Sequence, residues 1–149
     1  MDELPKRKTV DQPVLAMARS VNASHLGATT GRWAEHWLFL FPLWHGTMPA
    51  LFKGFLEQIF RPGFAMEYAK SGFPKRLLAG RSARIVVTMG MPALMYRWYF
   101  GAYGVRGFER SVLSFAGIKP IRESLYDVRR REEMGAWLED MRRHGERGD

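Results

Sequence analysis

The stretch WLFLFPLWHGTMPALFKGFLEQIF, residues 37–60, contains the signals that decide the fold. It begins with a continuous apolar and aromatic run that ends at Pro42, which is typical of a parallel strand buried on both faces. After Pro49 the apolar residues form one wide face and predict an amphipathic helix packed on a sheet, ending at Arg61-Pro62-Gly63. These apolar residues are Leu51, Phe52, Phe55, Leu56, Ile59 and Phe60.

The rest of the chain repeats this alternation of strands and helices. ARIVVT at residues 83–88 predicts a second buried strand, and residues 119–128 predict a third. Residues 64–81 read as a long connection, and a helix over residues 105–118 is expected to end at Gly117. A last helix has its apolar face at Met134, Trp137, Leu138 and Met141. The alternation implies an α/β fold with a parallel sheet.

Length and composition limit the classes of protein that this chain can be. Its 149 residues suit one domain, and 46% hydrophobic with 26% charged residues is a globular composition. The absence of cysteine excludes disulfides, thiolate metal sites and cysteine nucleophiles, and it fits a reducing compartment, so a cytoplasmic location is expected. The longest apolar run, Trp37–Trp44, is far shorter than the roughly 20 residues that span a bilayer.

The chain is strongly basic, with a net charge of +8 and a pI of about 10.2. Such a charge favours anionic partners, namely dinucleotides, nucleic acid or anionic lipid. The basic residues are spread along the chain and no common nucleic-acid recognition motif accompanies them, so we interpret them as solvated faces and expect no nucleic-acid partner.

Two predicted strand ends are candidates for a binding site. In open α/β sheets ligands bind at the carboxyl ends of strands, which here are residues 42–48 and 88–92. Both segments contain glycine, which lets a ligand approach the backbone, and large side chains such as Trp44 and Tyr96 border them. A planar heterocycle would suit this site, and two ordinary strand-to-helix turns remain the alternative.

Two longer segments carry a resemblance to a known family. FPLWHGTMPALFKGFLEQIFRPGFAMEY and LLAGRSARIVVTMGMPALMYRWYFGAYGVRGFERSVLSFAGIKPIR resemble the flavodoxin-like NAD(P)H dehydrogenases (quinone), including bacterial relatives known as ancillary subunits of potassium efflux systems. The likeness runs from about Trp33 to about Trp137. It implies a three-layer α/β/α fold, a homodimer, and a flavin, FAD or FMN, that passes a hydride from NAD(P)H to a quinone.

The resemblance also implies roles for particular residues. One loop would border the flavin ring with Pro42, Leu43, Trp44 and His45, and the other with Thr88, Met89, Gly90 and Met91. Tyr96 would hydrogen-bond near the flavin and assist charge redistribution, and Tyr103 stands where many relatives have a histidine that moves protons. A phenol is a poor base at neutral pH, which weakens the case for a relay through Tyr103.

Glu57 matches an acidic position near the flavin of some relatives. Lys53 lies one turn earlier, so an exposed ion pair between the two side chains is the alternative.

The front of the chain departs from the family pattern. Relatives hold the flavin phosphate in a loop that follows their first strand, and no such strand and loop are recognisable before residue 32. We therefore expect an irregular leader over residues 1–31, followed by a partial flavodoxin-like domain over residues 32–145. The alternative is that NASHLGATTG, residues 22–31, replaces the phosphate loop, since it contains hydroxyl side chains and glycines. A sheet that lacks its first strand–helix–strand unit would have an unpaired strand edge.

Three functional hypotheses follow. The first is a flavin-dependent NAD(P)H:quinone oxidoreductase. The second is a flavin-free remnant or regulatory binding module that associates with a partner such as a membrane transporter. The third, a protein that binds nucleic acid or a membrane surface, rests on the positive charge alone.

Overall fold

A computed structural model describes residues 34–69 and 72–147. Three parallel strands form its main sheet in the order β1-β4-β5, namely β1 (His36–Pro42), β4 (Ser82–Met89) and β5 (Ile121–Asp127). All three strands were predicted, β1 and β4 from apolar runs and β5 from residues 119–128, and their parallel pairing confirms the predicted α/β class. The expected leader and the missing phosphate loop lie outside the described residues.

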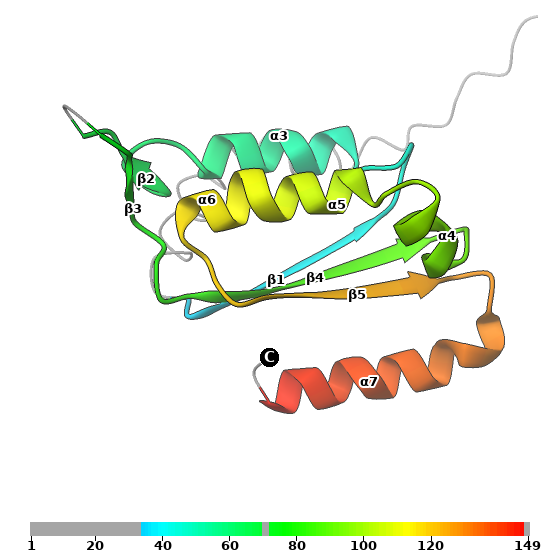
Figure 1. Cartoon of the computed structure of the whole chain (residues 1–149). Helices are drawn as coiled ribbons and strands as arrows, with labels where there is room; N and C mark the ends of the chain where they lie inside the picture. Colours follow the sequence, from blue (N-terminus) through cyan, green and yellow to red (C-terminus); the bar gives the residue numbers. More distant parts are fainter. Residues whose placement is uncertain (1–33, 70–71, 148–149) are drawn as a thin grey trace, which may run out of the picture.

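Helices lie on both faces of this sheet (Figure 1). One face carries α3 (Ala50–Ile59) and a composite helix made of α5 (Tyr103–Phe108), a π-helical turn (Glu109–Leu113) and α6 (Ser114–Ala116). The opposite face carries α7 (Met134–Arg147), so the described part has the predicted three-layer α/β/α arrangement. Gly117, with φ of 101°, ends the composite helix as predicted, because that backbone conformation suits glycine.

The connections contain structure that the sequence analysis did not resolve. The long excursion after α3 holds two short antiparallel strands, β2 (Met66–Glu67) and β3 (Lys75–Arg76). A short helix, α4 (Ala93–Trp98), follows β4, and a 3-10 turn (Arg131–Glu133) leads into α7. Strands of two residues have too little periodicity to be seen in a sequence.

The core lies between the sheet and the face that carries α3 and α5. The rings of Phe39 and Phe41 on β1 are almost fully buried there. Phe39 packs edge-on against Phe108 of α5 at 5.1 Å, and Phe41 contacts Phe52 of α3 at 5.2 Å between ring centroids. These aromatic contacts fix both helices on β1.

The prediction that β1 is buried on both faces is wrong for the described part of the chain. Phe39 and Phe41 are 6% and 3% exposed, but the alternating residues Leu38 and Leu40 are 63% and 61% exposed. The reason is the position of α7, which packs over β5 through a contact of Trp137 with Tyr126 at 5.4 Å. Within the described residues no second helix lies beside α7 over β1.

Candidate functional site

The two predicted loops meet at one edge of the sheet. β1 and β4 are neighbouring parallel strands, and Pro42, the last residue of β1, pairs with Thr88, the second-last residue of β4. Beyond this pair the backbone N–H of Leu43 donates a hydrogen bond of 2.7 Å to the carbonyl of Thr88. The sheet therefore brings together two segments that are more than forty residues apart in the sequence, as the predicted strand ends required.

The first loop is a tight turn that presents an aromatic ring. Trp44 and Thr47 exchange two backbone hydrogen bonds, of 2.9 and 3.0 Å, around His45 and Gly46. Both central residues have positive φ, 50° and 81°, which is the pattern of a type I′ turn. Trp44 is 60% exposed on this turn, and its ring is available to an incoming ligand.

Tyr96 supports this turn through a hydrogen bond from its buried side chain. Its side chain is 1% exposed, and its hydroxyl donates a hydrogen bond of 3.1 Å to the carbonyl of Gly46. Burial raises the pKa of Tyr96, so the hydroxyl stays protonated and keeps its role as donor. In this structure Tyr96 is a positioning residue for the turn, and its expected part in charge redistribution on the flavin stays a prediction.

Gly104 brings the start of α5 into direct contact with the same turn. A Cβ atom at Gly104 would lie 2.3 Å from the carbonyl oxygen of Gly46 and 2.8 Å from Cα of Thr47. Only a residue without a side chain permits this approach. The sequence analysis did not single out Gly104, although the signal was available as a glycine in the first turn of a helix.

The second loop, residues 88–91, contributes mainly backbone atoms to the candidate site. The side chain of Met89 is 2% exposed and belongs to the core, and its carbonyl accepts a hydrogen bond of 2.9 Å from the N–H of Val128. Thr88 and Met91 are half-buried, whereas Gly90 is exposed and has open space in front of it. Four residues of this loop were predicted to border the flavin ring, and the side chain of Met89 is buried too deeply to contact such a ring.

The other two predicted residues lie outside the paired loops. Tyr103, at the start of α5, is 78% exposed. Glu57 forms an exposed ion pair with Lys53 on α3, which is the alternative arrangement that the sequence offered. All three side chains line one cavity of about 460 Å³ between α3 and the composite helix, here called the α3–α5 groove. Its apolar lining is Met48, Leu56, Phe60, Met66, Phe108, Val112 and Phe115.

Residues 18–144 match the family model described as a flavodoxin-like fold. The chain belongs to this flavodoxin-like family. The three parallel strands and their helices are the part of that fold which the described residues supply.

Two curated relatives resemble parts of this flavodoxin-like chain. It is 33% identical over 89 residues to a ribosyldihydronicotinamide dehydrogenase-like protein of Penicillium crustosum, covering 55% of this chain and 32% of the relative. It is 31% identical over 61 residues to an FMN-dependent NADH:quinone oxidoreductase of Bordetella avium, covering 41% of this chain and 30% of the relative. The chain thus spans about a third of the length of these two curated relatives.

A solved structure extends the likeness to three dimensions. A protein of Streptococcus mutans UA159 superposes with a TM-score of 0.61 at 29% identity, covering 75% of this chain and 57% of that one.

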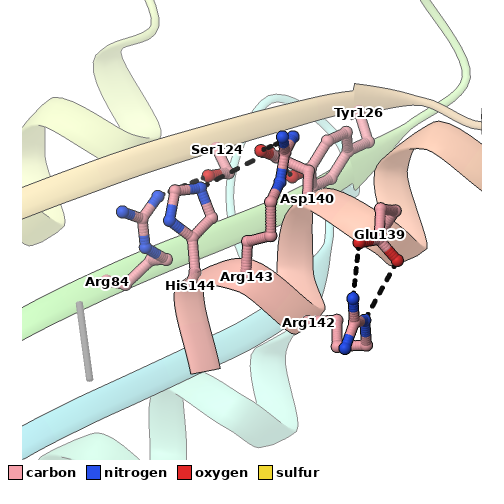
Figure 2. Close-up of polar contacts among 8 residues, drawn as sticks. All are labelled: Arg84, Ser124, Tyr126, Glu139, Asp140, Arg142, Arg143 and His144. Carbon is pink, nitrogen blue, oxygen red and sulfur yellow. Dashed lines mark hydrogen bonds and ion pairs between the residues drawn. The ribbon is translucent and has the colours of Figure 1, made fainter. Parts of the chain in front are cut away.

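The opposite face of this flavodoxin-like sheet carries a polar network that anchors α7 (Figure 2). Arg84 on β4 is 5% exposed and donates a hydrogen bond of 2.8 Å to Oγ of Ser124 on β5. The hydroxyl of Tyr126 donates a bond of 2.9 Å to Asp140 of α7, and His144 lies 3.4 Å from the same carboxylate. The bond from Tyr126 lowers the pKa of Asp140. The bond from Tyr126 thus ties α7 to β5, and the bond from Arg84 joins β4 to β5. No sequence signal predicted either bond.

A second polar anchor lies at the end of β5. Asp127 is 7% exposed and accepts two side-chain hydrogen bonds from Arg129, of 2.9 and 2.8 Å. These bonds lower the pKa of Asp127 and keep it ionised at the start of the turn that leads to α7.

Within residues 34–69 and 72–147, no three histidine or acidic side chains are grouped so that they could hold a metal ion. The helices of the same part are all too short or too polar to cross a bilayer.

Proposed function

We propose that this chain forms the ring-binding part of a flavin-dependent oxidoreductase that takes a hydride from NADH and passes two electrons to a quinone. The observation that carries the proposal is the pair of adjacent loops at the carboxyl edge of a parallel sheet, where such folds bind ligands. The relative from Bordetella avium is named as an FMN-dependent NADH:quinone oxidoreductase, so FMN and NADH are the first choices. FAD and NADPH are the alternatives that the family resemblance leaves for experiment.

The chemistry of the two loops fits a planar ring. A Cβ atom built on Gly46 or on Gly90 would meet nothing within 4 Å, so open space lies in front of both backbones. The exposed indole of Trp44 offers a flat apolar surface at the same edge. Backbone N–H groups aimed at the carbonyl edge of a ring stabilise negative charge on it. Bound flavin would supply the hydride chemistry, and these residues would orient it.

Tyr96 and Tyr103 have different roles in this proposal. Tyr96 keeps Gly46 and the Trp44 turn in place through its buried hydrogen bond. Tyr103 is exposed and lines the α3–α5 groove, so its phenol can donate a hydrogen bond to a substrate in that groove.

Flavin retention tests the proposal directly. The chain is incubated with FMN or FAD, passed through gel filtration, and its visible flavin absorbance is measured against protein concentration. We expect retained FMN close to one per chain and strongly reduced retention in Trp44→Ala. Trp98→Ala, which removes another exposed indole from α4, is the matched control and should retain flavin. A colourless wild-type protein, or equal retention by the two variants, would contradict the proposal and favour the flavin-free binding module.

Activity is the second readout. Flavin-loaded protein should oxidise more than one equivalent of NADH only when a quinone is present to accept the electrons, and NADPH in the same assay decides the preferred donor. We propose that this reaction takes place in the cytoplasm, because NADH is available there and a chain without cysteine suits a reducing compartment.

We also propose that the chain acts as a homodimer. Apolar side chains are exposed on the helices around the α3–α5 groove, including Leu51 and Phe55 of α3 and Phe115 of α6. An aspartate at Phe55 would place a charge in such an interface. Light scattering after gel filtration should show a dimer for the wild type and a smaller species for Phe55→Asp; a monomeric wild type would refute the dimer. A membrane transporter remains a partner proposed from the family resemblance.

A further inference from the structure

Apolar side chains face outward on α4, the short helix that follows β4. This helix buries a single side chain, and all the other residues from Leu94 to Phe100 are exposed. Leu94 and Trp98 lie one turn apart, as do Met95 and Tyr99, so the side chains of each pair are neighbours on the surface. The ring of Tyr99 contacts Phe100 edge-on at 4.9 Å between centroids. These residues form a continuous surface, here called the α4 patch, which consists of Leu94, Met95, Trp98, Tyr99 and Phe100.

The α4 patch is larger than the apolar surface that soluble proteins usually expose. Trp98 and Tyr99 are each 79% exposed. Aromatic side chains have about 150–250 Å² of surface, so these two alone present about 300 Å² to solvent. Leu94, Met95 and Phe100 add to this area, and contiguous apolar patches of more than a few hundred Å² mark interaction sites. The α4 patch therefore calls for a partner that covers it.

The exposed charges around the patch are positive. Among residues 93–113 the exposed charged side chains are Arg97, Arg106 and Arg110. Glu109 in the same stretch is half-buried, and so is Glu123, which forms an ion pair of 3.2 Å with Arg97. The surface that a partner meets is thus apolar and cationic, and it is complementary to a partner that combines negative charge with an apolar interior.

Two other kinds of partner fit this surface less well. A second copy joined through the same patch would place only positive exposed charges across the interface, where like charges repel. Single-stranded nucleic acid is bound by a basic groove that follows its backbone and by aromatic rings on which its bases stack. Leu94 and Met95 offer no ring for stacking, and residues 98–100 lie outside the α3–α5 groove.

A lipid surface matches both the charge and the residue types of the patch. Tryptophan and tyrosine combine an apolar ring with a polar atom, so they concentrate where a membrane meets water. Anionic head groups attract basic side chains beside such rings. We propose that the α4 patch docks this protein on a membrane that contains anionic lipid, with the rings at the level of the head groups and Arg97, Arg106 and Arg110 near the lipid phosphates.

The position of α4 connects this surface to the candidate site. α4 lies at the carboxyl ends of the strands, and its Tyr96 supports the turn that presents Trp44 (Figure 1). A ring bound there would lie close to the lipid phase, in which quinones with long apolar tails dissolve; this consequence rests on the proposed function. The docking itself is independent of whether the chain binds flavin.

Vesicle cosedimentation tests the proposal on the full chain without flavin. The wild type should sediment with vesicles of phosphatidylcholine and phosphatidylglycerol, and several-fold less with phosphatidylcholine alone. Trp98→Ser with Tyr99→Ser should reduce sedimentation with the mixed vesicles several-fold. Tyr68→Ser with Phe73→Ser is the matched control, because it removes two exposed rings that flank β2 and β3, and it should sediment like the wild type (Figure 1). A wild type that stays in solution, or equal losses in the two variants, would overturn the proposal.

A pair of charge variants tests the electrostatic part of the docking. Arg106→Gln with Arg110→Gln should lose most of the preference for vesicles that contain phosphatidylglycerol. Lys75→Gln with Arg76→Gln removes the same charge from exposed positions on β3 and should keep that preference. The same preference in both variants would contradict docking through α4. Binding to a single-stranded oligonucleotide in place of vesicles would identify nucleic acid as the partner and would also overturn the proposal.

Fluorescence quenching locates the contact on the protein. Phosphatidylcholine brominated on its acyl chains, added to the mixed vesicles, quenches tryptophan side chains that enter the membrane. The quenching seen for the wild type should be largely lost in Trp98→Phe. It should be kept in Trp137→Phe, which removes a half-buried indole that packs on Tyr126. Equal quenching in these two variants would refute the assignment of the membrane contact to α4.

Discussion

The contact between the start of α5 and the Trp44–Thr47 turn can be tested with two glycines of one helix. Gly104 and Gly107 both lie in α5, and neither has a positive φ, so alanine is compatible with the backbone at either position. A Cβ at Gly104 would lie 2.3 Å from the carbonyl oxygen of Gly46, whereas a Cβ at Gly107 would meet nothing within 4 Å. The added methyl group therefore meets the turn in Gly104→Ala and meets nothing in Gly107→Ala.

The structure sets the expected size of each effect. Carbon and carbonyl oxygen normally keep about 3.3 Å apart, so Gly104→Ala must move the helix or the turn by about 1 Å. Overpacking of this kind costs about 1–3 kcal/mol, and the better helix propensity of alanine returns at most about 1 kcal/mol. Gly104→Ala should lower the free energy of unfolding by about 1–2 kcal/mol, and Gly107→Ala should raise it by about 0.5–1 kcal/mol.

Urea unfolding followed by circular dichroism measures this difference. With an m value of about 1–3 kcal/mol per molar urea, the midpoints of the two variants should differ by about 1 M, with Gly104→Ala lower. Because the turn also presents Trp44, Gly104→Ala should bind flavin more weakly than Gly107→Ala. If Gly104→Ala were as stable as Gly107→Ala, the helix and the turn would not be in contact, and the basis for the positioned site would fail.

Three further substitutions test the remaining contacts. Tyr96→Phe removes the hydrogen bond to Gly46 and should lower the free energy of unfolding, measured by urea titration, by about 1 kcal/mol. Tyr99→Phe is the control and should have no effect, because Tyr99 is 79% exposed. Equal free energies of unfolding for the two variants would refute the bond. Burial, and then a nearby carboxylate, raise the pKa of Glu123 above 4.5. The wild type should therefore lose stability as the pH rises from 4.5 through that folded-state pKa, and Glu123→Gln should lose less stability over the same range. Parallel stability profiles of the two proteins against pH would contradict this. The hydrogen bond from the half-buried Tyr126 lowers the pKa of Asp140 below 3.8. The stabilisation from this carboxylate is therefore present above pH 3.8 and is lost as the pH falls through its folded-state pKa. Thermal melts of Asp140→Asn should show a weaker acid dependence, and an unchanged acid dependence would count against the network under α7.

Much of the fold could be predicted from local patterns. The runs 37–41 and 83–88 became β1 and β4, and the apolar period after Pro49 became α3, because strand and helix periodicity are properties of neighbouring residues. Parallel strands end at one edge of their sheet, so the meeting of Pro42 with Thr88 also followed from the order of elements.

The roles of individual side chains were less predictable. Tyr96 was expected at the flavin, but its hydroxyl is directed to Gly46, and Met89 was expected at the ring, but its side chain is in the core. Gly104 was not singled out at all. The roles of Tyr96 and Gly104 depend on a turn that lies 38 or more residues away in the sequence. The role of Met89 depends on which face of β4 its side chain occupies.

The sequence by itself determined the class of fold, the three parallel strands, the main helices and the two loops of the candidate site, since these depend on short-range period and chain order. Only the tertiary structure decided that His45 and Gly46 adopt positive φ in the turn after Trp44, and that the hydroxyl of Tyr126 on β5 bonds Asp140 of α7. It also decided that Leu38 and Leu40 stay exposed on the face that carries α7. The physical reason is that exposure and hydrogen-bond partners are set by which elements pack together, and that packing is a property of the whole chain.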